Sequence, residues 1–297
     1  MVDEISMLPN KMWLTLLRHP VYILAVGDPG QLPPLPPKAG EEETNNHVLD
    51  NPHIFLDEIM RQAQDSEIIR LSMHVREGLS LRDFPCAQEE VQIFKPHQVV
   101  DGMYLWADQI LCATNAKKNQ INNFVRKQLG YGEEPCIGDK IICRENHWDR
   151  LSIADEWALT NGAIGTISKF NVEKIGYPSY ICNTQVDYMY TDMRFEEAND
   201  DFIALPIDYK KLTTDTSALT GPQIYRVNGF ANKGKCAPAP YEFNYAYAIT
   251  THKAQGSEWD KILVFEENFP FQNEEHKRWL YTAITRASKK LVIVTKS

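Results

Sequence analysis

The sequence predicts an α/β fold in which a parallel sheet carries a β-rich insertion. Two apolar runs, at residues 22–26 and 110–115, each end in glycine or polar residues, as central strands of a parallel sheet do. An amphipathic helical pattern follows the second run and completes a βα unit. From Gly138 onward the pattern changes to short β-like runs divided by turns, which indicates a separate β-rich segment.

Length and composition are those of a globular protein with room for two domains or three. The 297 residues are 43% hydrophobic and 24% charged. No apolar run approaches the roughly 18 residues of a membrane span, so we expect no membrane partner and a cytoplasmic protein, in a bacterial or a phage-infected cell. The six cysteines form no C-x-x-C pair, which disfavours a zinc cluster. A net charge of −9 disfavours coating of nucleic acid by bulk charge but allows a local basic groove.

The chain opens with two adjacent carboxylates, Asp3 and Glu4, where we expect a strand to end. In P-loop enzymes such a pair follows a buried strand. The aspartate there holds Mg²⁺, and the glutamate positions the attacking water. An isolated pair of this kind is otherwise a solvated surface feature, so its meaning depends on the motif that follows.

That next motif is the turn at residues 27–34, which reads G-D-P-G-Q-L-P-P. It follows the apolar run 22–26, which we expect to form a central parallel strand. The glycines and prolines of the turn fix unusual backbone angles and hold Gln31 in one place. Rigid placement suits a sensor of a γ-phosphate, and the preceding acidic pair makes a plain surface turn a poorer explanation.

A polar, acidic segment at residues 36–51 is predicted to be an exposed loop. After it, Arg61 is by itself an ordinary charge near a helix start. A helical pattern then ends at Gly78, a typical helix stop. Its apolar face is expected to contain Ile68, Leu71, Ser72 and Val75.

Thr114 and Asn115 lie where the run from Ile110 meets the following helix. The N-terminus of a helix binds anions, so this junction can seat a backbone phosphate of DNA. The helix is basic, with Lys117, Lys118, Arg126 and Lys127. A solvated helix face explains these charges almost as well, and both interpretations remain open.

The β-rich segment contains Asn161-Gly162, the strongest short signal for a hairpin. Residues 190–223 are acidic, match no motif and are expected to be irregular. We expect the parallel sheet to resume at residues 243–249. Four aromatic residues can either stack on bases or pack in the core, and packing is favoured. They are Trp148, Trp157, Phe170 and Tyr241.

Residues 247–259 combine a strand end with groups that handle phosphate. Thr250 ends an apolar run, and Lys253 supplies a positive charge. Gly256 lets a backbone N–H approach a phosphate closely. A helix is expected over residues 279–287, with an apolar face and a second face that carries Thr282 and Arg286, and a buried strand over 291–294.

These residues resemble the signature motifs of superfamily 1 DNA helicases, in particular the RecD-like branch that includes the phage Dda helicases. The last two motifs correspond to T-x-H-K-x-Q-G-x-E, from Thr250, and Y-T-A-I-T-R-A, from Tyr281. The sequences D-E-x-S and G-D-x-x-Q-L-P-P look like motifs II and III, which couple the nucleotide state to strand binding. The resemblance implies an enzyme of DNA replication, recombination or repair.

The resemblance also implies a domain organisation. Residues 1–60 would form the C-terminal part of a first RecA-like domain. Residues 61–137 and 242–297 would form a second RecA-like domain with a parallel sheet. Residues 138–241 would be an SH3-like β-barrel inserted into that second domain.

At the nucleotide, the resemblance implies ATP as substrate with Mg²⁺, and Arg61 becomes an arginine that reaches the γ-phosphate from the second domain. Catalytic roles are implied for Asp3, which also holds the Mg²⁺, Glu4, Gln31, Arg61 and Arg286. Further nucleotide contacts are implied for Gln255, Gly256 and Glu258. Contacts to single-stranded DNA, with 5′-to-3′ movement, are implied for Thr114, Asn115, Thr250, His252 and Lys253.

A P-loop of the form G-x-x-x-x-G-K-[ST] is not found among the 297 residues. In this family it precedes the Asp-Glu motif, so we expect the chain to be a C-terminal portion, either truncated or one half of a split gene with a separately encoded N-terminal half. The alternative is a non-catalytic fragment that binds single-stranded DNA or assembles with a partner.

Overall fold

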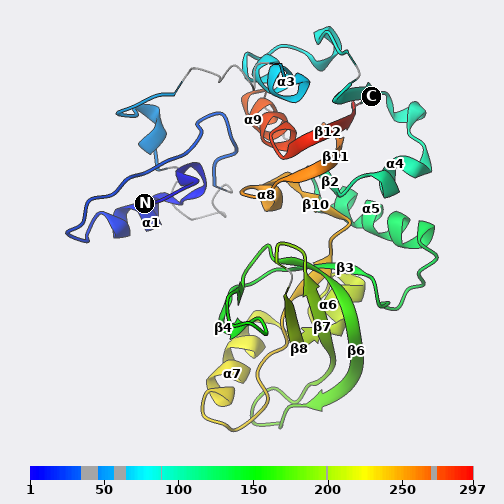
Figure 1. The fold of residues 1–297 in the computed structure, drawn as a ribbon. Coiled ribbons are helices and arrows are strands. Elements are labelled where there is room, and N and C mark those ends of the chain that lie inside the picture. Colours follow the sequence, from blue (N-terminus) through cyan, green and yellow to red (C-terminus); the bar gives the residue numbers. More distant parts are fainter. Residues whose placement is uncertain (35–45, 57–64, 88, 199, 269–272, 297) are drawn as a thin grey trace. The chain divides into compact units, whose positions relative to one another are not determined.

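The structure, a computed structural model, describes residues 1–34, 46–56, 65–87, 89–198, 200–268 and 273–296. It divides into two compact units, which are described separately (Figure 1). The first unit contains Met1–Lys118 and Ile249–Ser297, and the second contains Asn119–Ala248. Within the described ranges, every helix is too short or too polar to cross a membrane.

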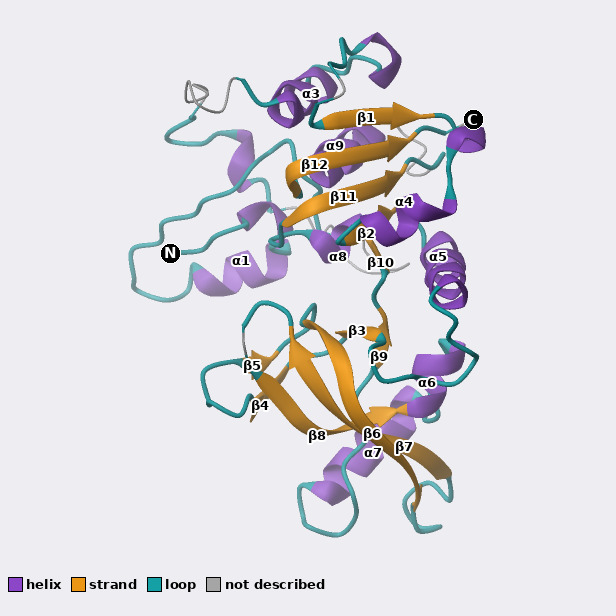
Figure 2. Ribbon diagram, turned by 45° about the vertical axis from the view of Figure 1, so that its right-hand side comes forward, coloured by secondary structure: helices purple, strands orange, loops and turns teal. Residues whose placement is uncertain are grey.

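The first unit is built on a five-stranded sheet in the order β1-β12-β11-β2-β10 (Figure 2). The pairings β1 with β12, β12 with β11, and β11 with β2 are all parallel. Strand β2 and the second half of β12 are buried, as apolar runs in a parallel sheet require. The predicted α/β fold with a parallel sheet is therefore confirmed. The strands are β1 (Val91–Phe94), β2 (Gln109–Cys112), β10 (Ala248–Thr250), β11 (Trp259–Phe265) and β12 (Ala287–Val294).

The helices of this unit follow the predicted apolar faces. Helix α3 (Glu67–Arg76) starts at Ser66, whose hydroxyl accepts a hydrogen bond from Ile69 N, and it buries all four residues predicted for its inner face. Gly78 follows it with φ +81°. Helix α3 packs against α9 (Asn273–Ile284). Other helices are α4 (Asp101–Trp106), α8 (Thr251–Ala254), η3 (Leu81–Asp83) and η4 (Pro96–Gln98). Helix α5 (Asn115–Gln128) begins in this unit and continues in the second.

Helix α9 ends earlier than the sequence predicted. The helical face was expected to run to Ala287, but the helix stops at Ile284 and Arg286 lies in the turn before β12. The carbonyl of Arg286 accepts a hydrogen bond from Trp259 N, so this residue already pairs with the neighbouring strand. Thr282, expected on the polar face, is fully buried.

The N-terminal segment differs from prediction at residues 22–26. These residues do not form a central strand; a single parallel bridge joins Ala25 to Val2. Tyr22 and Leu24 are exposed, because the described residues leave this run without a covering layer. The elements of this segment are η1 (Ile5–Met7), α1 (Asn10–Leu16) and η2 (Val48–Asp50). Most of the predicted loop at 36–51, up to residue 45, and all of the segment around Arg61 lie outside the described residues.

The second unit contains a five-stranded sheet in the order β8-β7-β6-β3-β9, with antiparallel pairs throughout (Figure 2). Residues 243–245 were expected in the parallel sheet, but they form β9 and pair with β3 here. The Asn161-Gly162 turn leads from β5 to β6, which lie in different sheets, so it makes no hairpin. The strands are β3 (Lys140–Cys143), β4 (His147–Leu151), β5 (Ala158–Leu159), β6 (Ile164–Gly176), β7 (Gln185–Phe195), β8 (Asp201–Asp208) and β9 (Phe243–Tyr245).

Residues 190–223, expected to be irregular, are largely ordered. They contain the end of β7, all of β8, helix α6 (Tyr209–Thr214) and the start of α7 (Gly221–Ala231). Phe202, Leu205 and Ile207 of β8 are buried in the core of the sheet. The acidic residues around β8 favour an irregular segment in the sequence-based prediction, although the apolar residues of β8 form a buried strand.

A buried ion pair ties α5 to the start of β3 in this unit. Arg126 Nε lies 2.9 Å from Asp139 Oδ1, and the guanidinium lies over the ring of Tyr245. The sequence predicts that Arg126 faces either DNA or solvent, but Arg126 is buried, as is Lys118. Helix α5 therefore exposes fewer positive charges to solvent than its sequence suggests.

Candidate active site

The acidic pair lies in a tight turn at the start of the first unit. Glu4 has φ +50°, a left-handed conformation that is uncommon for a residue with a side chain. Asp3 is exposed, and its Oδ1 accepts a hydrogen bond of 2.8 Å from Glu4 N. Glu4 is half-buried, and its Oε2 is buried without a hydrogen-bond partner among the described residues.

The pKa of Glu4 responds to the charges of other predicted site residues. Burial raises the pKa of the Glu4 carboxyl above its usual value. The positive charge of Arg286 opposes that rise, whereas the negative charges of Asp3 and Asp28 add to it. Glu4 and Arg286, far apart in the sequence, therefore share one local field.

The turn that carries Gln31 packs closely against the acidic pair. A Cβ on Gly27 would lie 2.8 Å from Ile5 Cγ2 and 3.1 Å from Ile5 N, so glycine is required for this approach. Asp28 Oδ1 accepts a hydrogen bond of 2.8 Å from Gly30 N, which tightens the turn. Gln31 itself is half-buried, and its Oε1 is buried with no partner in the described part of the chain.

The same turn is held against α9 and the segment after α8. Leu32 N donates a hydrogen bond of 3.0 Å to Thr282 Oγ1. Leu32 O accepts one of 3.2 Å from Gln255 Nε2. The main chain next to Gln31 is thus fixed by two side chains from the C-terminal motifs.

Arg286 is only 7% exposed and is held by neutral acceptors. Its guanidinium donates to Thr282 O at 3.2 Å, to Ser257 O at 3.3 Å and to Thr285 Oγ1 at 3.2 Å. Burial lowers the pKa of Arg286, and the nearby negative charges of Glu4, Glu258 and Asp28 oppose that change. Such an arginine is positioned to bind an anion with little reorganisation.

The turn between α8 and β11 contributes the remaining predicted nucleotide contacts. Gly256 has φ +79°, is exposed, and has open space where a Cβ would lie. Gln255 Oε1 is buried without a partner among the residues that the structure describes, and Glu258 is exposed. Within the described ranges, three buried side-chain oxygens of this cluster, on Glu4, Gln31 and Gln255, therefore have no hydrogen-bond donor. Orphaned acceptors of this kind fit a site that binds water, hydrated Mg²⁺ or a ligand.

The predicted strand contacts lie around the end of β2. Thr114 and Asn115 follow β2, and Thr251 Oγ1 donates to Cys112 O at 3.4 Å, which brings the start of α8 beside that strand end. His252 and Lys253 are half-buried in α8, and Thr250 precedes it. Burial lowers the pKa of His252, which favours its neutral form.

The donors of Thr114 already have a partner. Glu267 Oε2 accepts hydrogen bonds from Ala113 N at 2.6 Å and Thr114 N at 3.0 Å. Thr114 Oγ1 donates to Glu267 Oε1 at 2.7 Å. A carboxylate from the end of β11 therefore occupies the position predicted for a phosphate.

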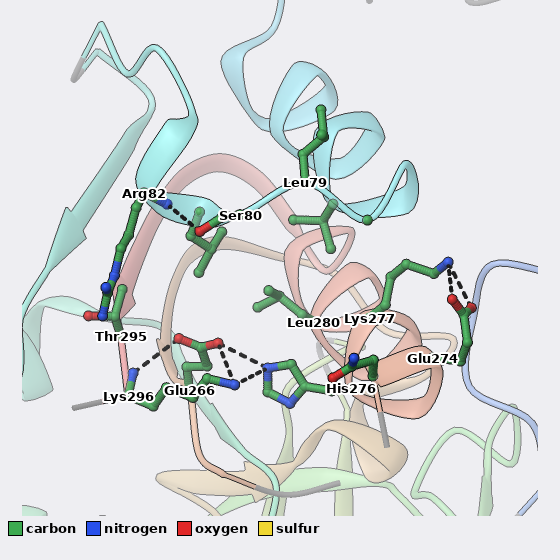
Figure 3. Close-up of a pocket in the computed structure, with 14 residues that line it drawn as sticks. Leu79, Ser80, Arg82, Glu266, Glu274, His276, Lys277, Leu280, Thr295 and Lys296 are labelled. Carbon is green, nitrogen blue, oxygen red and sulfur yellow. Dashed lines mark hydrogen bonds and ion pairs between the residues drawn. The ribbon is translucent and has the colours of Figure 1, made fainter. Parts of the chain in front are cut away.

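A cavity of about 620 Å³ lies between α3, α9 and the segments that follow β11 and β12 (Figure 3). Its lining includes Leu79, Leu280 and the side chains of Glu266, His276 and Lys296. None of the predicted site residues that the structure describes lines it. Burial would raise the pKa of Glu266, but the hydrogen bonds from His276 and Lys296 N outweigh that effect and lower it.

Three residues that organise the site were missed by the sequence reasoning. Asp28 and Tyr281 lie inside recognised motifs, but no role was assigned to them, and Arg76 lies outside any motif. Tyr281 OH donates to Asp28 Oδ2 at 2.6 Å, and Arg76 Nη1 lies 3.4 Å from Asp28 Oδ1. Only their position inside the motifs G-D-x-x-Q-L-P-P and Y-T-A-I-T-R-A could have drawn attention to the first two.

Comparison with known proteins places this geometry in context. Residues 245–294 match the family model of the UvrD-like helicase C-terminal domain. The match includes Gln255, Gly256, Tyr281 and Arg286. It confirms the resemblance to superfamily 1 helicases over this part of the chain.

Several solved structures with a similar fold are Pif1 helicases. The Pif1 helicase from Candida albicans shares 16% identity, with 99% of this chain and 71% of that chain covered and a TM-score of 0.54. Bacteroides Pif1 bound to ssDNA shares 17% identity, with coverages of 98% and 69% and a TM-score of 0.56. The Bacteroides enzyme in complex with ADP-AlF3 and ssDNA shares 16% identity, with 98% of this chain and 69% of that chain covered and a TM-score of 0.55. At such identities these matches establish the fold.

Proposed function

We propose that this chain is the C-terminal portion of an ATP-dependent DNA helicase that moves 5′ to 3′ on single-stranded DNA. The observation that supports this most strongly is the assembly of Glu4, the Gln31 turn and Arg286 in one cluster. Residues near both ends of the chain form it. The match to a UvrD-like helicase C-terminal domain and the structures of Pif1 with nucleotide analogue and ssDNA support the same assignment.

The chemistry of the cluster suits hydrolysis of a phosphoanhydride. Glu4 and Gln31 each present a buried acceptor oxygen, which can hold and orient an attacking water. Arg286 presents a buried positive charge to the charge that develops on the γ-phosphate. An arginine in this role is worth about 10³ to 10⁵ in rate. Arg61, outside the described residues, is proposed as a second such arginine.

Mg²⁺ would be held between the nucleotide and Asp3. Asp3 is exposed directly beside Glu4, and one protein carboxylate with phosphate oxygens is a usual ligand set for this ion. When bound, Mg²⁺ supplies charge neutralisation of the phosphates. The neighbouring orphaned oxygens of Glu4 and Gln31 fit its hydration shell.

The strand contacts are proposed at Thr114, Asn115, Thr250, His252 and Lys253. Lys253 supplies charge, whereas a neutral His252 supplies a hydrogen bond without charge. The direction of movement rests on the resemblance of the motifs to the RecD-like branch. The antiparallel sheet of the second unit is proposed to belong to the SH3-like barrel of that branch.

A separately encoded polypeptide that carries the P-loop is proposed as a partner. The sequence contains no P-loop of its own. The segment before residue 57 exposes many large apolar side chains, which a partner would cover. They include Met12, Leu14, Leu17, Val21, Tyr22, Leu24, Ile54, Phe55 and Leu56.

The test is DNA-stimulated hydrolysis of ATP. The chain alone should be inactive, and activity should appear when a polypeptide with the P-loop is added. Arg286→Ala should then abolish activity, whereas Lys289→Ala, which removes an exposed charge three residues away, should leave it unchanged. Activity that survives Arg286→Ala, or that never appears, would contradict the proposal and favour a non-catalytic strand-binding or assembly role.

A further inference from the structure

A carboxylate of the chain itself binds at Ala113 and Thr114, beside the junction where a DNA phosphate is predicted. This position is called the seat below. Three donors, the amides of Ala113 and Thr114 and the hydroxyl of Thr114, converge on the two carboxylate oxygens of Glu267 at 2.6 to 3.0 Å. Two adjacent amides and a hydroxyl are also the donors that bind phosphate oxygens at a strand end. Glu267 thus occupies the position that a phosphate would take.

The neighbouring carboxylate, Glu266, has other partners. Strand β11 ends at Phe265, and neighbouring side chains along an extended chain point to opposite sides. Glu266 is therefore directed away from the seat. Its Oε1 lies 2.9 Å from His276 Nε2, and its Oε2 accepts a hydrogen bond of 3.0 Å from Lys296 N (Figure 3).

The charge of Glu267 acts on the strand end that it caps. Burial raises the pKa of the Cys112 thiol to about 12, and the negative charge of Glu267 adds to that rise. Lys117 is nearby, with its Nζ 4.9 Å from the ring centroid of Phe265. A phosphate approaching the seat would meet the donors already engaged and a like charge at contact distance.

We propose that Glu267 is an internal competitor for the backbone phosphate of single-stranded DNA at this seat. The strand displaces the carboxylate when it binds, and the carboxylate returns when the strand leaves. The contact lowers affinity at this one point and eases release of the strand. The inference rests on the proposed function, because it takes Thr114 as a strand contact.

A purely structural cross-link between β11 and the start of α5 is the competing explanation. Glutamine separates the two, because Glu267→Gln keeps the size and one acceptor oxygen but removes the charge. If the contact only holds the fold together, this change weakens or leaves unchanged the binding of DNA. If the carboxylate competes with phosphate, the same change strengthens binding.

The experiment measures binding of a fluorescein-labelled oligo(dT) to the full chain by fluorescence anisotropy. We expect Glu267→Gln to tighten binding about tenfold, the effect of removing roughly one like-charge contact. The control is Glu275→Gln, which makes the same change of net charge at an exposed position of α9. Thermal unfolding of each variant checks that it is folded.

The outcomes separate the inference from the proposed function. Tighter binding by Glu267→Gln and not by Glu275→Gln supports the inference. If the wild type binds oligo(dT) and the Glu267→Gln variant binds it equally well or more weakly, the inference is overturned and the proposed function remains intact. Failure of every variant and of the wild type to bind overturns the strand contact and the inference together.

Hydrogen exchange on the wild-type chain gives a second readout that needs no variant. The amides of Ala113 and Thr114 are bonded to Glu267 in the absence of DNA. Exchange in the peptide that contains them should change when oligo(dT) is added, because their acceptor changes from carboxylate to phosphate. Unchanged exchange under saturating oligo(dT) would overturn the inference.

Discussion

The hydroxyl of Tyr281 donates a hydrogen bond of 2.6 Å to Asp28 Oδ2, and this contact joins the helix before Arg286 to the turn that carries Gln31. Arg76 strengthens the connection, with its guanidinium 3.4 Å from Asp28 Oδ1 and 5.5 Å from the centre of the Tyr281 ring. The position of Gln31 is therefore set by residues of the C-terminal motifs. A movement of α9 would be transmitted to the turn directly.

Tyr281→Phe tests this connection, because it removes the hydroxyl and keeps the ring. Asp28 would lose a donor in a half-buried place, so we expect a loss of about 1 to 2 kcal/mol in the free energy of unfolding, measured in urea. In the reconstituted ATPase, kcat should fall more than the affinity for ATP. Tyr225→Phe is the matched control, since Tyr225 is exposed. Equal effects of the two changes would refute the connection.

The second prediction concerns acid sensitivity and His252. Burial lowers the pKa of His252, so the unfolded state takes up a proton at a higher pH than the folded state. The stability that this group contributes is present above its ordinary pKa, about 6.5, and is lost as the pH falls through that value and the lower folded one. His252→Asn should flatten the decline in unfolding free energy below about pH 6.5.

Urea titrations at a series of pH values between neutral and mildly acidic measure this effect. His97→Asn serves as the control, because His97 is exposed. A variant at position 252 that declines as steeply as the wild type would show that burial of this ring does not govern the response. A decline flattened equally by both changes would lead to the same conclusion.

The third prediction compares a buried and an exposed ion pair within the second unit. Asp139→Ala leaves Arg126 buried without its carboxylate and also removes the acceptor of Tyr247 OH, so we expect a loss of about 3 to 5 kcal/mol. Asp201→Ala breaks the more exposed pair with Arg194, at 3.4 Å, and should cost less than about 1 kcal/mol. Denaturant unfolding measures both, and similar losses would contradict the prediction.

Helices and strands whose signals lie within a short stretch of sequence were predicted correctly. Helix α3 was predicted because its apolar spacing and the stop at Gly78 are both local. The strand at 291–294 was predicted because an apolar run that is buried on both faces has few alternatives. The prediction that Glu4 and Arg286 share one site has a different basis, namely their resemblance to known motifs.

The remaining features depend on contacts that a local pattern does not contain. Residues 22–26 have the composition of a central strand, but strand formation requires paired neighbours and covering layers. Residues 243–245 fit either sheet equally, and pairing with β3 decides between them. Helix α9 has no glycine or proline to mark its end; the pairing of Arg286 with Trp259 marks it instead.

In the candidate site, too, contacts between distant residues could not be predicted from local sequence. The hydrogen bond from Tyr281 to Asp28 joins residues 253 positions apart, and nothing in the motif reveals it. Arg76 reaches the same carboxylate from a helix that carries no motif. Glu267 caps the end of β2 from the end of β11, so its role depends on sheet order alone. Such residues are visible only once the chain is folded.

The last prediction concerns the apolar surface before residue 57. Tyr22 and Leu24 belong to a run with the composition of a buried strand, yet their side chains are exposed. Among the described residues, the backbone of this run bonds to the segment around Val2 and Ile5. If a partner with the P-loop covers this run, a charge placed there should block assembly. Leu24→Glu should therefore reduce the ATPase of the reconstituted pair by at least about tenfold, because burying an unpaired charge is costly.

The stability of the isolated chain gives the decisive contrast for that change. Leu24 contributes little to the core of this chain, so Leu24→Glu should leave its unfolding free energy within about 0.5 kcal/mol of the wild type. Ile203→Glu, at another exposed apolar side chain in the second unit, should affect neither assembly nor stability. Full assembly of the Leu24→Glu chain would show that the run is a free surface, and the proposed partner would then have to bind elsewhere.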